Sequence, residues 1–106
     1  MAAAEKVISF EAVKGANTGY SKMPTWFIEY LLEANLSKVQ SRILLAVARQ
    51  TYCYGKSEDD VTINRLAQIA KLSRTNASPV FNQMVDDGII LARKGKHGFI
   101  VSINPN

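Results

Sequence analysis

The fold is decided by residues 61–103, which read VTINRLAQIAKLSRTNASPVFNQMVDDGIILARKGKHGFIVSI. Apolar side chains recur at helical spacing over residues 63–70 and again over residues 74–87, so each segment would present one apolar face to a core. Residues 71–73 separate the two segments and are few enough for a tight turn. Gly88 is well placed to cap the second helix, because a left-handed conformation costs glycine little. The pattern predicts a helix, a tight turn and a second helix.

The residues that follow change from a helical period to the pattern of a β-hairpin. Residues 89–92 form a short apolar run, and residues 99–103 are rich in β-branched side chains. The loop expected between them, residues 93–98, is basic and contains two glycines. A helix-turn-helix followed by a hairpin with a positively charged tip is the element order of a winged helix. We therefore expect an α+β winged helix-turn-helix, mainly helical, with about four helices and a C-terminal hairpin wing.

Two further helices are expected before the helix-turn-helix. The first should run from Pro24, a residue that suits the first helical turn, to about Asn35. The second should open with a capping box, in which Ser37 and Gln40 satisfy each other's backbone N–H groups, and should persist to about Thr51.

A polar loop at residues 55–60 separates these helices from the helix-turn-helix, with a very short strand expected at Val61–Thr62 and Thr62 as the next N-cap. The loop contains three consecutive acids, Glu58, Asp59 and Asp60. No partner base accompanies them in the sequence, so we expect them to be solvated. Because they would repel an anion, the loop is expected to face away from nucleic acid.

Length and charge limit the possible classes of protein. A chain of 106 residues is enough for a single core, and we expect one winged-helix domain over residues 20–106 after a flexible arm over residues 1–19. The net charge of +4 fits a nucleic-acid partner without requiring one. Its distribution says more: residues 61–85 contain no acid, and every charged side chain after Asp87 is basic.

The sequence also argues against several functions. Cys53 is the single cysteine and His97 the single histidine, so no metal site and no disulfide within the chain is expected. There is no glycine-rich phosphate loop and no nucleophile–histidine pair, so we expect neither an enzyme nor a bound cofactor. Without an apolar run long enough for a signal peptide or a membrane span, the chain is expected in a reducing cytoplasm and away from membranes.

The second helix of the helix-turn-helix carries the candidate base-contacting residues. In such folds the N-terminal part of this helix meets base edges in the major groove. The helical phase that turns the apolar residues inward leaves a polar outer face and its flanks, which comprise Arg74, Thr75, Asn76, Ser78, Pro79 and Asn82. Arginine suits guanine and asparagine suits adenine, which favours contact with DNA bases. The alternative is a solvated helix face without a partner.

Pro79 departs from the usual pattern of such a helix. Proline inside a helix removes a backbone hydrogen bond and clashes with the preceding turn, at about 3 kcal/mol. The helix is either bent but continuous, or begins late with Ser78 as its cap, and the unbroken apolar period from Ala77 favours the continuous form. In both forms Pro79 can touch a thymine methyl group but cannot donate a hydrogen bond to a base.

The hairpin and the tight turn supply candidates for contact with the DNA backbone. These basic residues are Lys71, Arg93, Lys94, Lys96 and His97. Cations at a wing tip lie along phosphates or in the minor groove, where the release of counterions favours binding. A turn that only improves solubility is the alternative.

Several stretches of the chain resemble the N-terminal, origin-binding domain of the lambda-type phage replication protein O family. The resemblance extends over roughly residues 19–103 and is carried by Gly19–Tyr20, Leu31–Ala34, Leu36–Ser37, Ile43–Tyr52, Gly55–Lys56 with the acidic pair after it, Ile63–Leu72 and Gly88–Ile90. The part from Arg49 to Lys56 is more particular to this family, whereas the second half is common to winged helices.

The resemblance implies binding of double-stranded DNA at repeats of a phage-type replication origin, as a dimer, inside a bacterial host cell. In that family a separate C-terminal region recruits the replicative helicase through its loader. The helicase-loading region is expected to be absent from this chain, whose sequence ends soon after the wing. Two alternatives stay open: a transcriptional repressor, and a winged-helix module that binds a replication or host protein.

Overall fold

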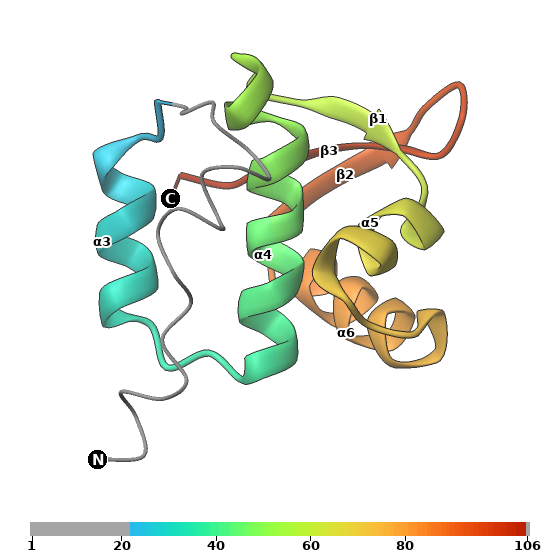
Figure 1. The fold of residues 1–106 in the computed structure, drawn as a ribbon, viewed down its shortest axis with the longest axis horizontal. Coiled ribbons are helices and arrows are strands. Elements are labelled where there is room, and N and C mark those ends of the chain that lie inside the picture. The colour runs from blue at the N-terminus through green and yellow to red at the C-terminus, as the bar shows by residue number, and fades with distance from the viewer. Residues whose placement is uncertain (1–21, 106) are drawn as a thin grey trace, which may run out of the picture.

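The computed structural model describes residues 22–105, which form a group of helices and a small antiparallel sheet (Figure 1). The elements in chain order are α3 (Thr25–Glu33), α4 (Lys38–Gln50), the 3-10 helix η1 (Tyr52–Tyr54), β1 (Asp59–Val61), α5 (Ile63–Ala70), α6 (Arg74–Asp86), β2 (Ile90–Lys94) and β3 (Phe99–Ile103). The arm predicted over residues 1–19 lies outside the described residues. The mainly helical α+β class predicted from the sequence is confirmed.

The first two helices begin where the local sequence predicts. Ser37 Oγ accepts a hydrogen bond from the Gln40 N–H at 3.1 Å, and Gln40 Oε1 accepts one from the Ser37 N–H at 2.9 Å. The predicted capping box of α4 is therefore confirmed. Pro24, the predicted start, occupies the N-cap position of α3, so the helix begins one residue later, at Thr25. α3 and α4 end within two residues of their predicted ends, which is the usual uncertainty at a fraying terminus.

The helix-turn-helix is formed by α5 and α6, and both helices have the side-chain caps expected of their sequence. Thr62 Oγ1 accepts a hydrogen bond from the Arg65 N–H at 3.1 Å, and Ser73 Oγ accepts one from the Asn76 N–H at 3.2 Å. α6 runs without a break through Pro79, so the continuous form is confirmed and the late start at Ser78 is wrong.

The core forms where α4 meets α5, α6 and β3, with α6 also packed against β2. Helical spacing on these elements turns the apolar positions toward one another, and their burial supplies the main stabilising free energy. The largest fully buried side chains are Phe27, Ile43, Leu44, Met84, Ile90, Val47, Val101 and Thr51. α3 joins this core through edge-on aromatic contacts with η1: the ring centroid of Tyr52 lies 5.7 Å from that of Phe27 and 6.4 Å from that of Trp26.

The sheet has the strand order β1-β3-β2, and both pairs are antiparallel. β2 and β3 form the predicted hairpin after Gly88, whose φ of +81° confirms the left-handed cap. Two boundaries differ from the prediction. Arg93 and Lys94 pair with Ile100 and Phe99 and so belong to β2, which shortens the wing loop to residues 95–98.

The third strand begins earlier than predicted. β1 covers Asp59–Val61 in place of Val61–Thr62, because Asp59 pairs with Val101 and Val61 with Phe99. This pairing brings the acidic loop onto the sheet, beside the strand that leads out of the wing.

Candidate nucleic-acid interface

The N-terminal half of α6 presents the predicted polar face to solvent. Five of the six candidate base-contacting side chains are exposed, namely Arg74, Thr75, Asn76, Pro79 and Asn82, and Ser78 is half-buried. Opposite this face Ala77, Phe81 and Met84 are buried, as the helical phase predicts. Arg74 is partly held in place, since its Nη1 donates a hydrogen bond to Asn64 Oδ1 of α5 at 3.3 Å. Asn64, an exposed residue of α5, was not among the residues predicted from the sequence.

The turn that joins α5 to α6 contains a residue in the left-handed region. Lys71 has φ 61° and ψ 43°, a conformation that costs a non-glycine residue about 1–2 kcal/mol. Two contacts hold it: the Leu72 N–H donates to the Ala67 carbonyl at 2.9 Å, and Arg42 Nη1 of α4 donates to the carbonyls of Ala70 and Lys71 at 3.2 and 3.4 Å. Arg42 thereby ties the turn to α4 and sets the angle at which α6 leaves it.

A carboxylate from β1 holds the tip of the wing. Asp60 Oδ2 accepts hydrogen bonds from the backbone N–H groups of Lys96 at 2.7 Å and His97 at 3.0 Å, and Oδ1 accepts one from Gly98 at 2.9 Å. Consecutive N–H groups that converge in this way form an anion-binding concavity. The His97 N–H, followed by those of Gly98 and Lys96, holds the pKa of Asp60 below its usual value because these bonds favour the charged form.

The two glycines of the wing loop are required by close approach of other atoms. A Cβ added at Gly95 would lie 2.5 Å from Asp60 Oδ1, and a Cβ added at Gly98 would lie 2.2 Å from the Val61 carbonyl oxygen. The Gly95 N–H donates to the Gly98 carbonyl at 2.8 Å and closes the loop. The wing tip is thus packed directly against the junction of β1 and α5.

The acidic residues were predicted to be solvated, and this prediction is wrong for Glu58 and Asp60, which contact the wing. Besides the contacts of Asp60, Glu58 Oε2 lies 2.6 Å from Arg93 Nη2, and Asp59 Oδ1 lies 3.3 Å from Lys56 Nζ. The physical reason is the pairing of β1 with β3, which no local pattern announces. Asp60 thus holds the wing loop, and Arg93 is paired with Glu58.

The other basic side chains of the wing are free to contact a partner. Lys94, Lys96 and His97 are exposed, and none of them forms an ion pair with a carboxylate of the described residues. Lys71 is exposed at the turn. The wing loop and the start of α6 lie toward the same end of the molecule (Figure 1). The structure therefore brings the predicted helix face and the predicted wing cations to one end of the domain.

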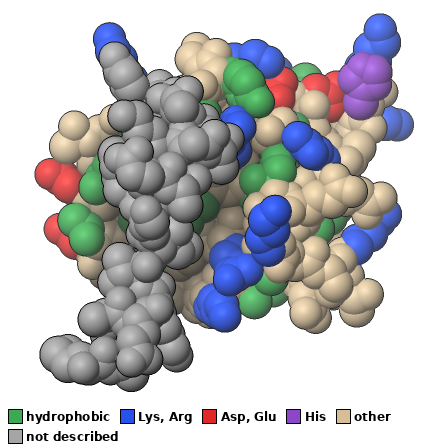
Figure 2. Space-filling view, viewed as in Figure 1, with side chains coloured by type: hydrophobic (Ala, Val, Ile, Leu, Met, Phe, Trp, Pro, Cys, Tyr) green, Lys and Arg blue, Asp and Glu red, His purple; other side chains and the backbone are tan. Residues whose placement is uncertain are grey.

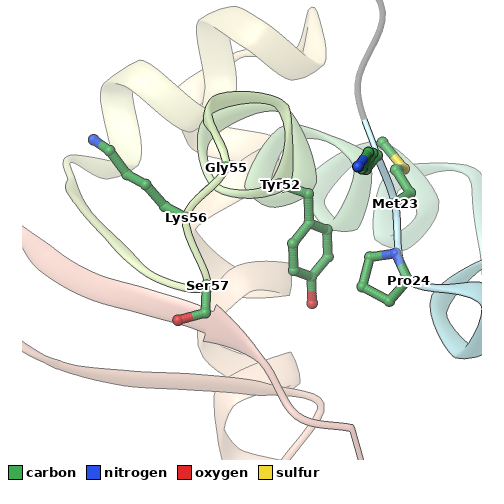
Figure 3. A pocket seen from close by; sticks show the side chains of 7 residues that line it. Met23, Pro24, Tyr52, Gly55, Lys56 and Ser57 are labelled. Atoms are coloured by element: carbon green, nitrogen blue, oxygen red, sulfur yellow. The ribbon is translucent and has the colours of Figure 1, made fainter.

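A cavity of about 430 Å³ lies elsewhere in the domain, and its lining includes Met23, Pro24, Tyr52, Lys56 and Ser57. Tyr52 projects into the space between the start of α3 and the segment that follows η1 (Figure 3). Burial raises the pKa of Tyr52, so its phenol stays neutral at physiological pH.

Within residues 22–105, no three His, Cys, Asp or Glu side chains come together in a way that could hold a metal ion. Cys53 is a half-buried free thiol. None of the described helices is long and apolar enough to cross a membrane.

The helix-turn-helix of α5 and α6, followed by the β2–β3 hairpin with its basic loop, defines a winged-helix domain. The family described as bacteriophage replication protein O matches residues 12–105, and the chain belongs to this family. Replication protein O of Escherichia phage lambda is 30% identical over 86 residues, which cover 81% of this chain and 26% of that protein. The chain thus spans about a quarter of the length of this relative. No solved structure matches the chain.

Proposed function

We propose that this domain binds double-stranded DNA sequence-specifically, with α6 in the major groove and the wing along the backbone. The proposal rests on the exposed polar face of α6, which lies at the same end of the molecule as the wing. Asp60 holds the wing loop, from which exposed basic side chains project. A helix N-terminus adds the partial positive charge of its backbone N–H groups. Neither catalysis nor a cofactor enters this proposal.

The base contacts are assigned to α6. Asn76 and Asn82 suit adenine, whose N6 amino group donates to the amide oxygen and whose N7 accepts from the amide nitrogen, and Arg74 suits guanine. Thr75 and Ser78 supply hydroxyl groups of less selective pairing. Pro79 is exposed on the same face and offers an apolar surface to a thymine methyl group.

The backbone contacts are assigned to Lys71, Lys94, Lys96 and His97. Arg93 is a fifth candidate, which forms an ion pair with Glu58 in the structure. Both side chains of this pair are well exposed, at 65% and 44%, so the pair is weak and a phosphate can replace the carboxylate.

Membership of the replication protein O family supports a role in phage replication inside a bacterial host. We assign the DNA site to the repeats of a phage-type replication origin, bound by two copies of the domain. The assignment concerns DNA recognition by residues 20–106 alone.

Gel-shift titration of genomic fragments with nonspecific competitor DNA tests the proposal. The expected result is a retained fragment that contains an origin. The logarithm of its affinity should fall linearly with the logarithm of the salt concentration, with a slope of about 0.9 for each phosphate contact. An affinity independent of salt would refute DNA binding. Recovery of a promoter in place of an origin would point to a repressor.

Two sets of substitutions separate the surfaces. Lys94→Ala with Lys96→Ala should weaken binding to every sequence and flatten the salt dependence. Asn82→Ala should weaken binding to the preferred site by about 1–3 kcal/mol and change binding elsewhere little. Asn82 is the better choice than Arg74, because Arg74 also contacts Asn64. Identical behaviour of the two sets would contradict the division of roles.

A further inference from the structure

A second basic surface lies between α4 and α5, outside the helix face and the wing. Two adjoining hollows of about 410 and 400 Å³ lie there and share Arg49, Ile69 and Lys71. Arg65, Gln50 and Gln68 complete the first hollow, and Arg42 reaches the second. We call this surface the α4–α5 basic groove. Figure 2 shows Lys and Arg side chains in a row over the seam between these two helices.

The groove concentrates positive charge without compensation. Arg42, Arg49, Arg65 and Lys71 all line it, whereas no acid lines either hollow. The ion pairs of the described residues involve Lys56 and Arg93, which lie elsewhere. Like charges gathered in a hollow repel one another, and an anion that binds there relieves the repulsion.

The donors of the groove fit phosphate groups. A guanidinium presents a planar fork of N–H donors that matches two phosphate oxygens, and the amides of Gln50 and Gln68 add neutral donors of the kind that contact DNA phosphates. Arg49 is preorganised, since its guanidinium carbon lies 5.2 Å from the ring centroid of Tyr54. The Arg65 side chain is exposed, and its guanidinium forms no ion pair within the described residues.

The groove is continuous with the interface assigned above. Lys71 lines both hollows and also forms the turn that leads into α6. Its carbonyl is bonded to Arg42, so the turn and the groove form one surface. A duplex that leaves α6 past this turn would meet the groove next, provided that it bends toward the domain.

We propose that the α4–α5 basic groove binds the phosphate backbone of duplex DNA that flanks the recognised site. The inference rests on the proposed DNA binding and extends it to a second contact. An acidic protein segment is the competing occupant, and the experiment below distinguishes the two.

The test compares two duplexes in fluorescence-anisotropy titrations of the full chain. One duplex contains the shortest sequence that is bound specifically, and the other extends it by about one helical turn, 10 base pairs, at each end. The wild-type protein should bind the longer duplex more tightly and with a steeper salt dependence. Equal binding of the two duplexes would overturn the inference and leave the groove to a protein partner.

The variant Arg49→Gln with Arg65→Gln removes two charges at exposed positions. It should bind the short duplex as the wild type does, but lose most of the additional affinity for the long one. Its salt slope on the long duplex should fall by about 2, at 0.9 per lost phosphate contact. Arg65→Gln alone, which leaves the Tyr54 contact intact, should lower that slope by about 1.

The matched control is Arg49→Lys with Arg65→Lys, which keeps both charges and should retain most of the long-duplex advantage. If this control loses as much affinity for the long duplex as the glutamine variant does, the groove does not bind phosphates through its positive charge. A glutamine variant whose affinity falls by the same factor on both duplexes would overturn the inference as well. Wild-type protein that binds neither duplex would refute the proposed function itself. Thermal melts of all variants monitored by circular dichroism confirm that each is folded.

Discussion

Replacing Gly98 by alanine should detach the wing from the junction of β1 and α5. The added Cβ would lie 2.2 Å from the Val61 carbonyl oxygen and 2.9 Å from Thr62 Cα, whereas ordinary contacts begin at 3.4 Å. The wing must therefore move by about 1.2 Å at this point, because the opposing atoms are backbone and cannot rotate away. Forced overpacking of this kind costs about 1–3 kcal/mol.

Urea unfolding measures the effect on stability. With a slope of about 1–3 kcal/mol per molar urea for a small domain, the unfolding midpoint of Gly98→Ala should fall by about 1 M without a change in slope. In gel shifts the displaced loop should bind DNA more weakly and with a flatter salt dependence, since the cations of the wing tip lose their fixed position.

Gly88→Ala is the control for this substitution. Gly88 has φ +81° with no atom within 4 Å of the added Cβ, so alanine there suffers backbone strain of about 1–2 kcal/mol without a clash. Its stability should fall comparably while DNA affinity stays at the wild-type level. A Gly98→Ala protein with the wild-type midpoint would refute the close approach of the wing to Val61.

Three other substitutions test the core, the carboxylate under the wing and the turn. Phe81→Ala, at a side chain 2% exposed whose ring centroid lies 6.1 Å from that of Phe99, should lower the free energy of unfolding by about 3–5 kcal/mol in urea titrations, and an unchanged midpoint would mean that the helical phase of α6 is wrong. Because Asp60 has a pKa below its unfolded value near 3.9, its contribution to stability is present above that pH and is lost as the pH falls through the lower, folded value. Between about pH 5 and pH 2 the urea midpoint of Asp60→Asn should therefore decline less than that of the wild type, and equal declines would exclude the carboxylate as a support of the wing. Arg42→Ala should destabilise the domain by about 1.5–3 kcal/mol, because the carbonyls of Ala70 and Lys71 lose a charged donor, and a thermal melt like that of the wild type would contradict this role.

Features that depend on neighbours in sequence were predictable. The caps at Ser37 and Thr62 involve residues three positions away, and the inward face of α6 follows from its helical period. Gly88 is a third case, since its left-handed conformation is required by the end of the helix just before it. The candidate residues of α6 were found for the same reason: the residues that face outward are those left over when the apolar ones face inward.

Residues whose role depends on distant partners were misjudged or missed. Asp60 was expected to be solvated, yet its hydrogen-bond partners Lys96 and His97 lie 36 and 37 positions away. Glu58 is 35 positions from Arg93, and Arg42 is 28 positions from Ala70. An acid next to a short strand has the same local pattern whether it is solvated or bound to a loop that the sheet brings beside it.

The sequence by itself determined the helices, their caps, the hairpin and the charges that each segment carries, because these follow from interactions within a few residues. Only the tertiary structure decided which charged side chains remain free to contact a partner. The pairing of β1 with β3 turned an acidic loop into the support of the wing and paired Arg93 with Glu58. The packing of α4 against α5 likewise gathered the arginines of separate helices into one groove. Strand pairing and helix packing depend on complementary surfaces far apart in the chain, and no single stretch of sequence contains both partners.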